Sequence, residues 1–157
     1  MRWAAALRAD WPRMTAAAAY LTRLGSAPVT LGIAGLAALW LLLRGAPRKA
    51  LLLTATVLAE RLLVDGLKEW VGRPRPPLEP LLAHSLAYPS GHSANSMTAF
   101  LATALIAAPA PYRRTMAVAA LLVAIVVGLT RIWLGVQWPS DGIGGGGLGV
   151  LGGGAPP

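Results

Sequence analysis

The chain has 157 residues, which is enough for one domain of ordinary size. Hydrophobic residues make up 55% of it and charged residues only 13%, about half the charged share of soluble domains, so we expect lipid to be part of its solvent. Because the sequence has no Cys, disulfides, thiolate catalysis and Cys-based metal sites are excluded, and two His leave little for a metal. The net charge of +8 is spread between apolar stretches, which favours lipid or phosphate over nucleic acid as the partner.

Residues 1–26 predict an amphipathic helix that lies in the membrane interface. Arginines alternate with apolar residues here, and Pro12 with the charged positions rules out the apolar core of a signal peptide. A poorly ordered basic tail is the alternative interpretation. We assign 1–26 to this interfacial helix and 27–157 to a transmembrane domain. The apolar residues near helical spacing are Trp3, Leu7, Trp11, Met14 and Leu21.

Five apolar stretches follow and predict membrane-spanning helices. The last has only 13 residues, about 20 Å of helix against a hydrocarbon core of about 30 Å, and it is rich in glycine. It is therefore either incomplete or a short, buried helix, because small residues permit close helix packing in lipid. We expect an all-α polytopic transmembrane bundle of about five spans plus the N-terminal interfacial helix. The stretches are 27–43, 50–67, 92–108, 116–134 and 142–154.

The second stretch contains charges, which at membrane depth normally face a bundle interior or a polar cavity. Arg61, Asp65 and Lys68 fall on one helical face. We interpret Glu60, Arg61 and Asp65 as a structural ion-pair network and not as catalytic residues.

Basic loops predict the orientation of the chain. The loops at 44–49 and 111–114 share one side of the bundle and carry five Lys or Arg, which is typical of the cytoplasmic side. The N-terminal arginines lie on the other side and argue against this orientation. We expect an integral protein of a bacterial inner membrane whose site faces away from the cytoplasm.

Three polar clusters fall at helix ends on that other side. Phosphoryl transfer requires fixed donors for the charge that spreads over the phosphate oxygens. Lysine and arginine supply cations, and a glycine at the start of a helix exposes backbone N–H groups to an anion. The clusters are Lys68 with Arg75-Pro76, then Pro89-Ser90-Gly91-His92, then Thr130-Arg131 with Gln137 and Asp141.

Together these clusters resemble the signature of the type 2 phosphatidic acid phosphatase family, which is Lys-x6-Arg-Pro, Pro-Ser-Gly-His and Ser-Arg-x5-His-x3-Asp. The first two motifs are complete, and the resemblance extends from residue 27 to about 150. The third has Thr130 in place of serine, which keeps the hydroxyl, and Gln137 in place of histidine.

The resemblance implies a membrane enzyme that removes phosphate from lipid phosphates without a metal or other cofactor. The phosphate group of the substrate would be held by Lys68, Arg75 and Arg131, together with Ser90 and the Gly91 amide. His92 would be the general acid. Position 137 would be the nucleophile, a histidine that becomes phosphorylated and that Asp141 holds in the required tautomer.

Gln137 should permit phosphate binding but prevent hydrolysis. A carboxamide nitrogen is not basic, so it cannot replace the imidazole in covalent catalysis, although it can donate a hydrogen bond to Asp141 or to phosphate. His84, the other histidine, lies outside the motifs. Glutamine here is either the natural residue or an inactivating substitution. We expect a phosphatase that acts on a polyprenyl diphosphate, phosphatidic acid or a similar lipid, and we expect this chain with Gln137 to be inactive. One alternative is a non-catalytic pseudophosphatase that binds an anionic phospholipid. The other is a structural subunit with a relic site.

Each motif also has a structural interpretation. Ser90 is a candidate helix N-cap as well as a site residue. Lys68 alone would mark the interface end of a span, and Arg131 alone would be a surface anchor. Asp141 alone would be a charge in the first turn of a helix capped by Ser140.

Overall fold

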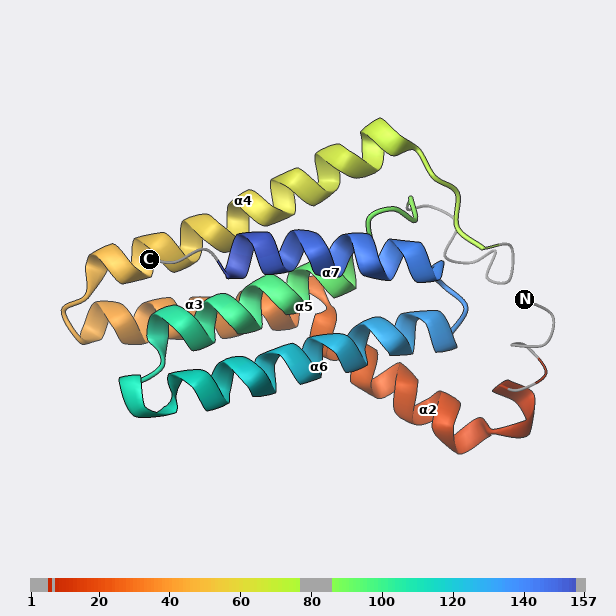
Figure 1. The fold of residues 1–157 in the computed structure, drawn as a ribbon, viewed down its shortest axis with the longest axis horizontal. Helices are drawn as coiled ribbons and strands as arrows, with labels where there is room; N and C mark the ends of the chain where they lie inside the picture. Colours follow the sequence, from red (N-terminus) through yellow and green to blue (C-terminus); the bar gives the residue numbers. More distant parts are fainter. Residues whose placement is uncertain (1–5, 7, 77–85, 155–157) are drawn as a thin grey trace.

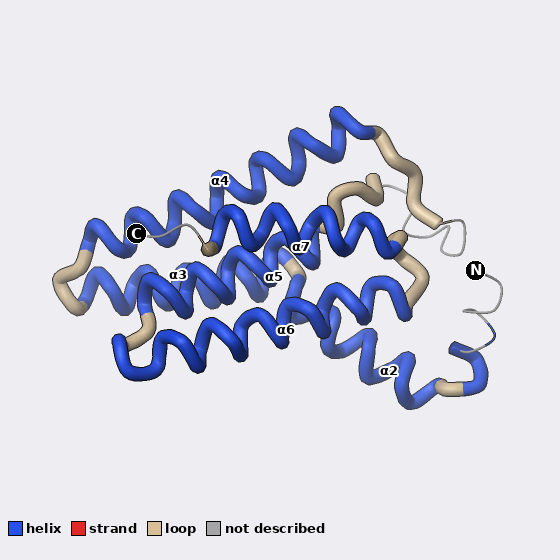
Figure 2. Tube along the Cα trace, in the orientation of Figure 1, coloured by secondary structure: helices blue, strands red, loops and turns tan. Residues whose placement is uncertain are grey.

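The computed structural model describes residues 6, 8–76 and 86–154, and every regular element among them is helical (Figures 1 and 2). The predicted all-α class is therefore confirmed. The elements are α2 (Pro12–Leu21), η1 (Thr22–Gly25), α3 (Ala27–Leu43), α4 (Pro47–Val71), α5 (Gly91–Ala102), the π-helical η3 (Thr103–Ala107), η4 (Ala110–Tyr112), α6 (Arg113–Trp133) and α7 (Pro139–Gly153).

Local sequence explains where these helices begin and end. Proline occupies one of the first two positions of α2, α3, α4 and α7, where its missing N–H costs no helical hydrogen bond. Gly72 ends α4 with φ 60°, a left-handed conformation that favours glycine, and its amide donates to the Lys68 carbonyl. The chain then enters a proline-rich segment, residues 73–76 (Arg-Pro-Arg-Pro), whose prolines cannot continue the helix.

Helix α5 lies at the centre of the bundle and contacts α3, α4, α6 and α7 (Figure 1). The α3–α4 turn and the α5–α6 turn lie at one end of the bundle. The proline-rich segment and the α6–α7 turn lie at the other end (Figure 1). The predicted grouping of loops into two ends is thus correct, and all three polar clusters fall at one end.

The outer surface of the bundle is apolar, as lipid exposure requires. Leu36, Leu43, Leu51 and Leu62 are each more than two-thirds exposed. Among the described residues, only the helical run Ala110–Trp133 is long and apolar enough by itself to cross a bilayer. Pro12–Gly25 and Ala27–Leu43 qualify only as a pair, and the pair is bent by 46°. The number of spans therefore stays a prediction.

Glycine explains how α7 packs. Gly149 and Gly153 face α5 so closely that an added Cβ would lie 2.5 Å from the Met97 Cβ and 3.0 Å from the Thr98 carbonyl oxygen, respectively. Gly145, one turn earlier, lies against the Ser90 carbonyl. This spacing of four places the three glycines on one face, where the absence of side chains lets two backbones touch. The glycine face of the last helix is thus buried against α5, while Ile143 and Leu151 on its other side are more than two-thirds exposed.

The predicted ion-pair network in α4 is wrong. Glu60 is 4% exposed and neither of its carboxylate oxygens has a hydrogen-bond partner; Nη1 of Arg61 is also buried without one. Consecutive residues project from different faces of a helix, so these two side chains diverge. Asp65 pairs instead with Lys68, at 3.7 Å.

The described part of the N-terminal segment is helical and packs on the end of α6. Nη1 of Arg8 donates to the Trp133 carbonyl at 3.0 Å, and the Trp133 indole donates to the Thr15 hydroxyl at 3.3 Å. Trp3 and Leu7 lie outside the described residues. The interfacial position of this segment, and the division at residue 26, stay predictions.

Candidate active site

A polar pocket of about 220 Å³ opens between α4, α5 and the α6–α7 turn. Five of the eight predicted site residues line it: Lys68, Arg75, Gly91, His92 and Gln137. Residues from all three sequence clusters therefore meet in one cavity. The pocket is also lined by Ala27, Arg61, Val64, Asp65 and Asn95.

The start of α5 forms one wall of the pocket. A Cβ added to Gly91 would lie 3.1 Å from the Lys68 ammonium, a tight contact that would displace the end of the lysine side chain by a few tenths of an ångström, so glycine lets Lys68 lie this close to the helix N-terminus. His92 follows, half-buried, under the electrostatic influence of Arg131, Arg75 and Lys68. The wall thus combines a helix N-terminus, an ammonium group and an imidazole, which suits an anion.

Ser90 caps α5, as predicted, from a fully buried position behind the pocket. Its hydroxyl accepts from the Ser93 amide at 3.4 Å and from the Ser93 hydroxyl at 3.1 Å. The Ser90 amide donates to the Asp141 carbonyl at 3.0 Å, which ties the start of α5 to the start of α7. Ser90 does not line the cavity, and its part in phosphate binding stays a prediction.

Arg75 reaches the pocket from the segment that follows α4. Its Nη1 donates to the Val136 carbonyl at 3.0 Å, next to Gln137. Burial lowers the pKa of Arg75 and the nearby Asp141 raises it, and the guanidinium stays protonated because arginine titrates far above neutral pH. Arg75 therefore brings a permanent charge to the cavity.

Arg131 lies behind the pocket wall and is only 8% exposed. This burial rules out the alternative of a surface anchor. Its Nη1 donates to the Thr22 hydroxyl over a long 3.4 Å, and its Nε is buried without a partner. A buried guanidinium with so few acceptors is costly, so the site is short of negative charge.

Gln137 and Asp141 contact each other at the start of α7. The side-chain nitrogen of Gln137 is assigned to the position where it donates to Asp141 Oδ2 at 3.0 Å and to the Ala87 carbonyl at 2.7 Å, because both of these atoms are acceptors. Both side chains are almost completely buried. The glutamine thus makes toward Asp141 the hydrogen bond that the N–H of a histidine would make.

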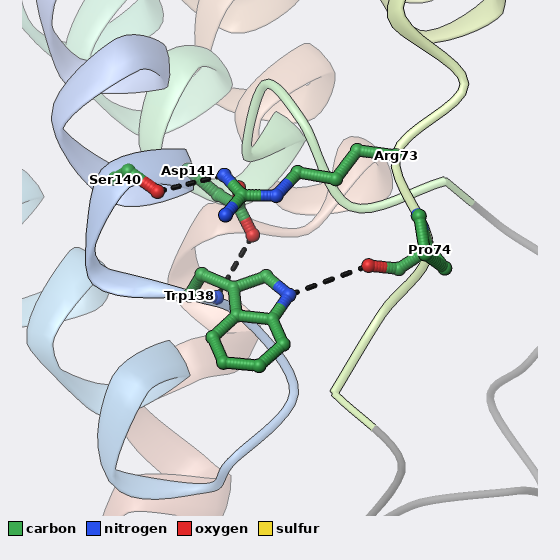
Figure 3. Close-up of polar contacts among 5 residues, drawn as sticks. All are labelled: Arg73, Pro74, Trp138, Ser140 and Asp141. Carbon is green, nitrogen blue, oxygen red and sulfur yellow. Dashed lines mark hydrogen bonds and ion pairs between the residues drawn. The ribbon is translucent and has the colours of Figure 1, made fainter.

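Arg73 is a functional candidate that the sequence analysis missed. Its Nη1 lies 2.8 Å from Asp141 Oδ1 and 2.7 Å from the Ser140 hydroxyl, and its guanidinium covers the Trp138 ring (Figure 3). The Trp138 indole also donates to the Pro74 carbonyl at 3.3 Å (Figure 3). The repeated Arg-Pro in Arg73-Pro74-Arg75-Pro76 was the available signal, because only the second arginine has a place in the motif.

The predicted cap at Ser140 is wrong. Helix α7 begins at Pro139, and Asp141 Oδ2 accepts from the Trp138 amide at 2.8 Å, so the acidic side chain in the first turn performs the capping. Ser140 is inside the helix and accepts from Arg73 instead. Asp141 is therefore shared among Arg73, Trp138 and Gln137.

No group of three or more His, Asp or Glu within residues 6, 8–76 and 86–154 is placed to hold a metal ion. The absence of a metal requirement stays a prediction that chelation can test.

Comparison with known proteins identifies the family. The sequence profile of the PAP2 superfamily matches residues 49–155. The chain belongs to this superfamily. The profile includes all three clusters, and PAP2 is the type 2 phosphatidic acid phosphatase family that the motifs resemble.

Known PAP2 proteins are similar in sequence and in fold. Phosphatidylglycerophosphatase B of Bacillus subtilis (strain 168) is 35% identical over 98 residues, which cover 59% of this chain and 48% of that protein. The chain therefore spans about half the length of this curated relative. The crystal structure of the first transmembrane PAP2 type phosphatidylglycerolphosphate phosphatase from Bacillus subtilis superposes with a TM-score of 0.81 at 29% identity, over 90% of this chain and 73% of that one.

A second solved structure, that of Aquifex aeolicus LpxE, matches with a TM-score of 0.69 at 22% identity, over 90% of this chain and 84% of that one. At this identity it supports the fold alone. The two superpositions confirm the transmembrane helical bundle of the PAP2 fold.

Proposed function

We propose that the pocket binds the phosphate group of a membrane lipid, and that the same pocket with histidine at position 137 hydrolyses it. One observation carries the proposal: Lys68, Arg75 and His92 share a single polar cavity with position 137. The buried guanidinium of Arg131 behind it, which lacks a partner on Nε, adds to the demand for an anion.

In this proposal each residue of the three motifs has one task. Lys68, Arg75 and Arg131 stabilise the charge that spreads over the phosphate oxygens, with the N-terminus of α5 at Ser90 and Gly91. A histidine at 137 attacks phosphorus, the P–O bond to the lipid breaks, and His92 donates a proton to the leaving oxygen. Water then breaks the P–N bond and gives a proton to His92, which restores the resting state.

Asp141 positions the residue at 137 and does not touch substrate. It is completely buried and already holds the Gln137 nitrogen at 3.0 Å, so it supplies the acceptor that would fix one imidazole tautomer. Arg73 holds the other carboxylate oxygen at 2.8 Å. These contacts support the assignment of Asp141 as a positioning residue.

The chain as written binds without turnover in this proposal. The lone pair of the Gln137 side-chain nitrogen is delocalised into the carbonyl, so it is not available to attack phosphorus. The two N–H groups of this nitrogen also donate to two acceptors, Asp141 Oδ2 and the Ala87 carbonyl. The same hydrogen bonds favour the second candidate function, a pseudophosphatase that holds an anionic phospholipid. A buried glutamine with both donors satisfied is a stable residue in its own right.

The substrates are lipids with a phosphate monoester or diphosphate, such as a polyprenyl diphosphate or phosphatidic acid. Phosphatidylglycerophosphate joins them because the relative with 35% identity is named for that lipid. The membrane is the bacterial inner membrane, the site faces away from the cytoplasm, and neither a metal nor another cofactor takes part.

The test is phosphate release from a panel of these lipids, in one detergent, by the chain and by its Gln137→His variant. We expect release only from the histidine variant, at least about 10³-fold above the glutamine chain, because loss of a nucleophile costs this much or more. EDTA should leave the rate unchanged. Adding His92→Asn to the histidine variant is the matched control, since it removes the proton donor from the same cavity.

Three results discriminate the candidates. Release by the glutamine chain itself would contradict the mechanism at position 137. Binding of lipid phosphate by both proteins with release by neither would favour the pseudophosphatase. If no lipid phosphate in the panel raised the melting temperature of either protein, a phosphate site would be refuted.

A further inference from the structure

The pocket continues inward beyond the three clusters. Arg61 and Asn95 line the same cavity as Lys68 and His92. Arg61 precedes Lys68 by seven residues, which places it on the same face of α4, two turns or about 10 Å further from the proline-rich end. Asn95 lies one turn inside α5 from Gly91. The inner end of the cavity therefore has polar groups of its own.

Within the described part of the chain Arg61 forms no ion pair. Its Nη1 is buried and has no hydrogen-bond partner. Asp65 has the i, i+4 spacing that suits an ion pair with Arg61, yet Asp65 pairs with Lys68 at 3.7 Å. A desolvated guanidinium N–H without an acceptor is unfavourable, and the planar fork of arginine matches phosphate well. An anionic group in the cavity would supply the missing acceptor.

The lining of the cavity is also net positive among the described residues. Arg61, Lys68 and Arg75 line it, and Asp65, already engaged by Lys68, is the one carboxylate in the lining. In a partly buried site this net positive charge favours an anionic ligand.

The course of α4 through the bundle indicates where an anionic group bound to Arg61 would lie. Helix α4 spans Pro47–Val71, so Lys68 lies near the end that meets the proline-rich segment, and Arg61 lies two turns nearer the middle of the helix. If the reacting phosphate lies beside His92, the lipid tail extends toward the bilayer interior. A group beside Arg61 therefore lies between the reacting phosphate and the tail.

We propose that Arg61 and Asn95 form a subsite for a second phosphate, between the reacting phosphate and the lipid tail. The proposal rests on the proposed function, because the reacting phosphate defines the outer end of the pocket. Two lipid classes carry this chemistry: a polyprenyl diphosphate, with directly linked phosphates, and phosphatidylglycerophosphate, with a glycerol between them. Phosphatidic acid carries one phosphate and leaves the subsite empty.

The test measures equilibrium binding to the chain with Gln137, because this protein holds lipid without consuming it. Dissociation constants for the three lipids are compared in one detergent for the unaltered chain, Arg61→Gln, Arg61→Lys and Asn95→Ala. The control is Arg48→Gln, which removes an exposed arginine from the first turn of the same helix. Melting temperatures without lipid verify that each variant is folded.

We expect Arg61→Gln to weaken the binding of at least one two-phosphate lipid by about 10- to 100-fold, and the binding of phosphatidic acid by less than about 3-fold. Arg61→Lys should lose less because it keeps the charge without the fork, and Asn95→Ala should lose about 5-fold, as for a neutral hydrogen bond. Arg48→Gln should change nothing. The two-phosphate lipid that responds identifies the separation of the phosphates.

Equal losses on all three lipids, or no loss on any, would overturn the subsite. Phosphate release by the Gln137→His variant is measured in parallel. Absence of release would count against the proposed phosphatase while the binding pattern still judges Arg61. Normal release with a flat binding pattern would remove the subsite alone.

Discussion

Asp141 gathers three donors from different parts of the chain. It accepts from the Arg73 guanidinium at 2.8 Å, from the Trp138 amide at 2.8 Å and from the Gln137 side chain at 3.0 Å. A completely buried carboxylate is tolerated only when it is paired and hydrogen-bonded, and these contacts meet that condition. One side chain thus caps α7, anchors the segment after α4 and orients position 137.

The first prediction concerns Asp141→Asn in the Gln137→His variant. An asparagine can turn its amide toward the histidine and select the wrong tautomer, so we expect kcat to fall by about 10²- to 10⁴-fold. Affinity for the lipid should change by less than about 3-fold, because Asp141 does not line the pocket. Steady-state phosphate release and lipid binding measure the two effects. An unchanged kcat would exclude Asp141 as the positioning residue.

The second prediction concerns Arg73→Leu. This change leaves Asp141 with one donor fewer and removes the cation that covers Trp138, so the unfolding free energy should fall by about 1–3 kcal/mol. Thermal melting in detergent measures the loss. Arg48→Leu, at the exposed start of α4, is the matched control and should melt like the unaltered chain. Equal melting of Arg73→Leu and the control would show that the anchor contributes nothing.

At the scale of elements, the packing of α5 against α7 brings the second and third clusters together. Eight of the 15 residues of α7 (PSDGIGGGGLGVLGG) are glycine, and at Gly145, Gly149 and Gly153 an added Cβ would lie 3.0 Å or less from the start of α5 or from α5 itself. Glycine disfavours an isolated helix by about 1 kcal/mol per residue relative to alanine. The helix therefore depends on its contact with α5 more than on its own sequence.

The third prediction uses two glycines of α7 that differ only in what they face. Gly149→Ala would place a methyl 2.5 Å from the Met97 Cβ and 2.9 Å from the Ala94 carbonyl oxygen, so we expect a melting temperature several degrees lower and weaker lipid binding. At Gly147 no atom lies within 4 Å of the added Cβ, and Gly147→Ala should be neutral or stabilising. The opposite ranking of the two melting temperatures would contradict the packing.

The elements also show how far the sequence alone predicts this protein. The bounds of α3 follow from an uninterrupted apolar run, and they are those expected. Three spaced motifs predicted five of the residues that line the pocket, because local sequence marks helix ends and the motifs fall at one end of the bundle. Arg61 and Arg73 could not be assigned from spacing, since which side chain faces a cavity or a carboxylate is decided by how separate helices pack.

At the scale of the whole molecule, the bundle has two chemically different ends. One end carries the α3–α4 and α5–α6 turns with Arg44 and Arg113 near them, and the other carries the pocket (Figure 1). Cationic turns favour the cytoplasmic side of a membrane. The arginines of the N-terminal segment are the exception, and two of them have partners: Arg8 bonds the Trp133 carbonyl, and Arg23 covers the Tyr20 ring.

The fourth prediction concerns orientation in the membrane. Since the sequence has no Cys, single cysteines can be labelled without background. In intact cells we expect a membrane-impermeant maleimide to modify Trp70→Cys, at the exposed end of α4 next to the pocket, and to modify Ala46→Cys, in the α3–α4 turn, only after lysis. The reverse pattern would place the site on the cytoplasmic side.

The order of helices in the chain has a consequence for biosynthesis. Gln137, in the α6–α7 turn, is the last pocket-lining residue to be translated, and Asp141, which lies behind it in α7, follows four residues later. A ribosome-bound intermediate that ends before Pro139 contains the cationic wall of the site and position 137, but it lacks the Asp141 carboxylate behind them. We expect such an intermediate to be inserted yet unable to process lipid even with the histidine codon, so that the proposed phosphatase site becomes competent only when the glycine-rich helix docks. Pulse-labelled, stalled nascent chains of increasing length would show activity at one abrupt length, and activity in chains that stop before Pro139 would contradict this order.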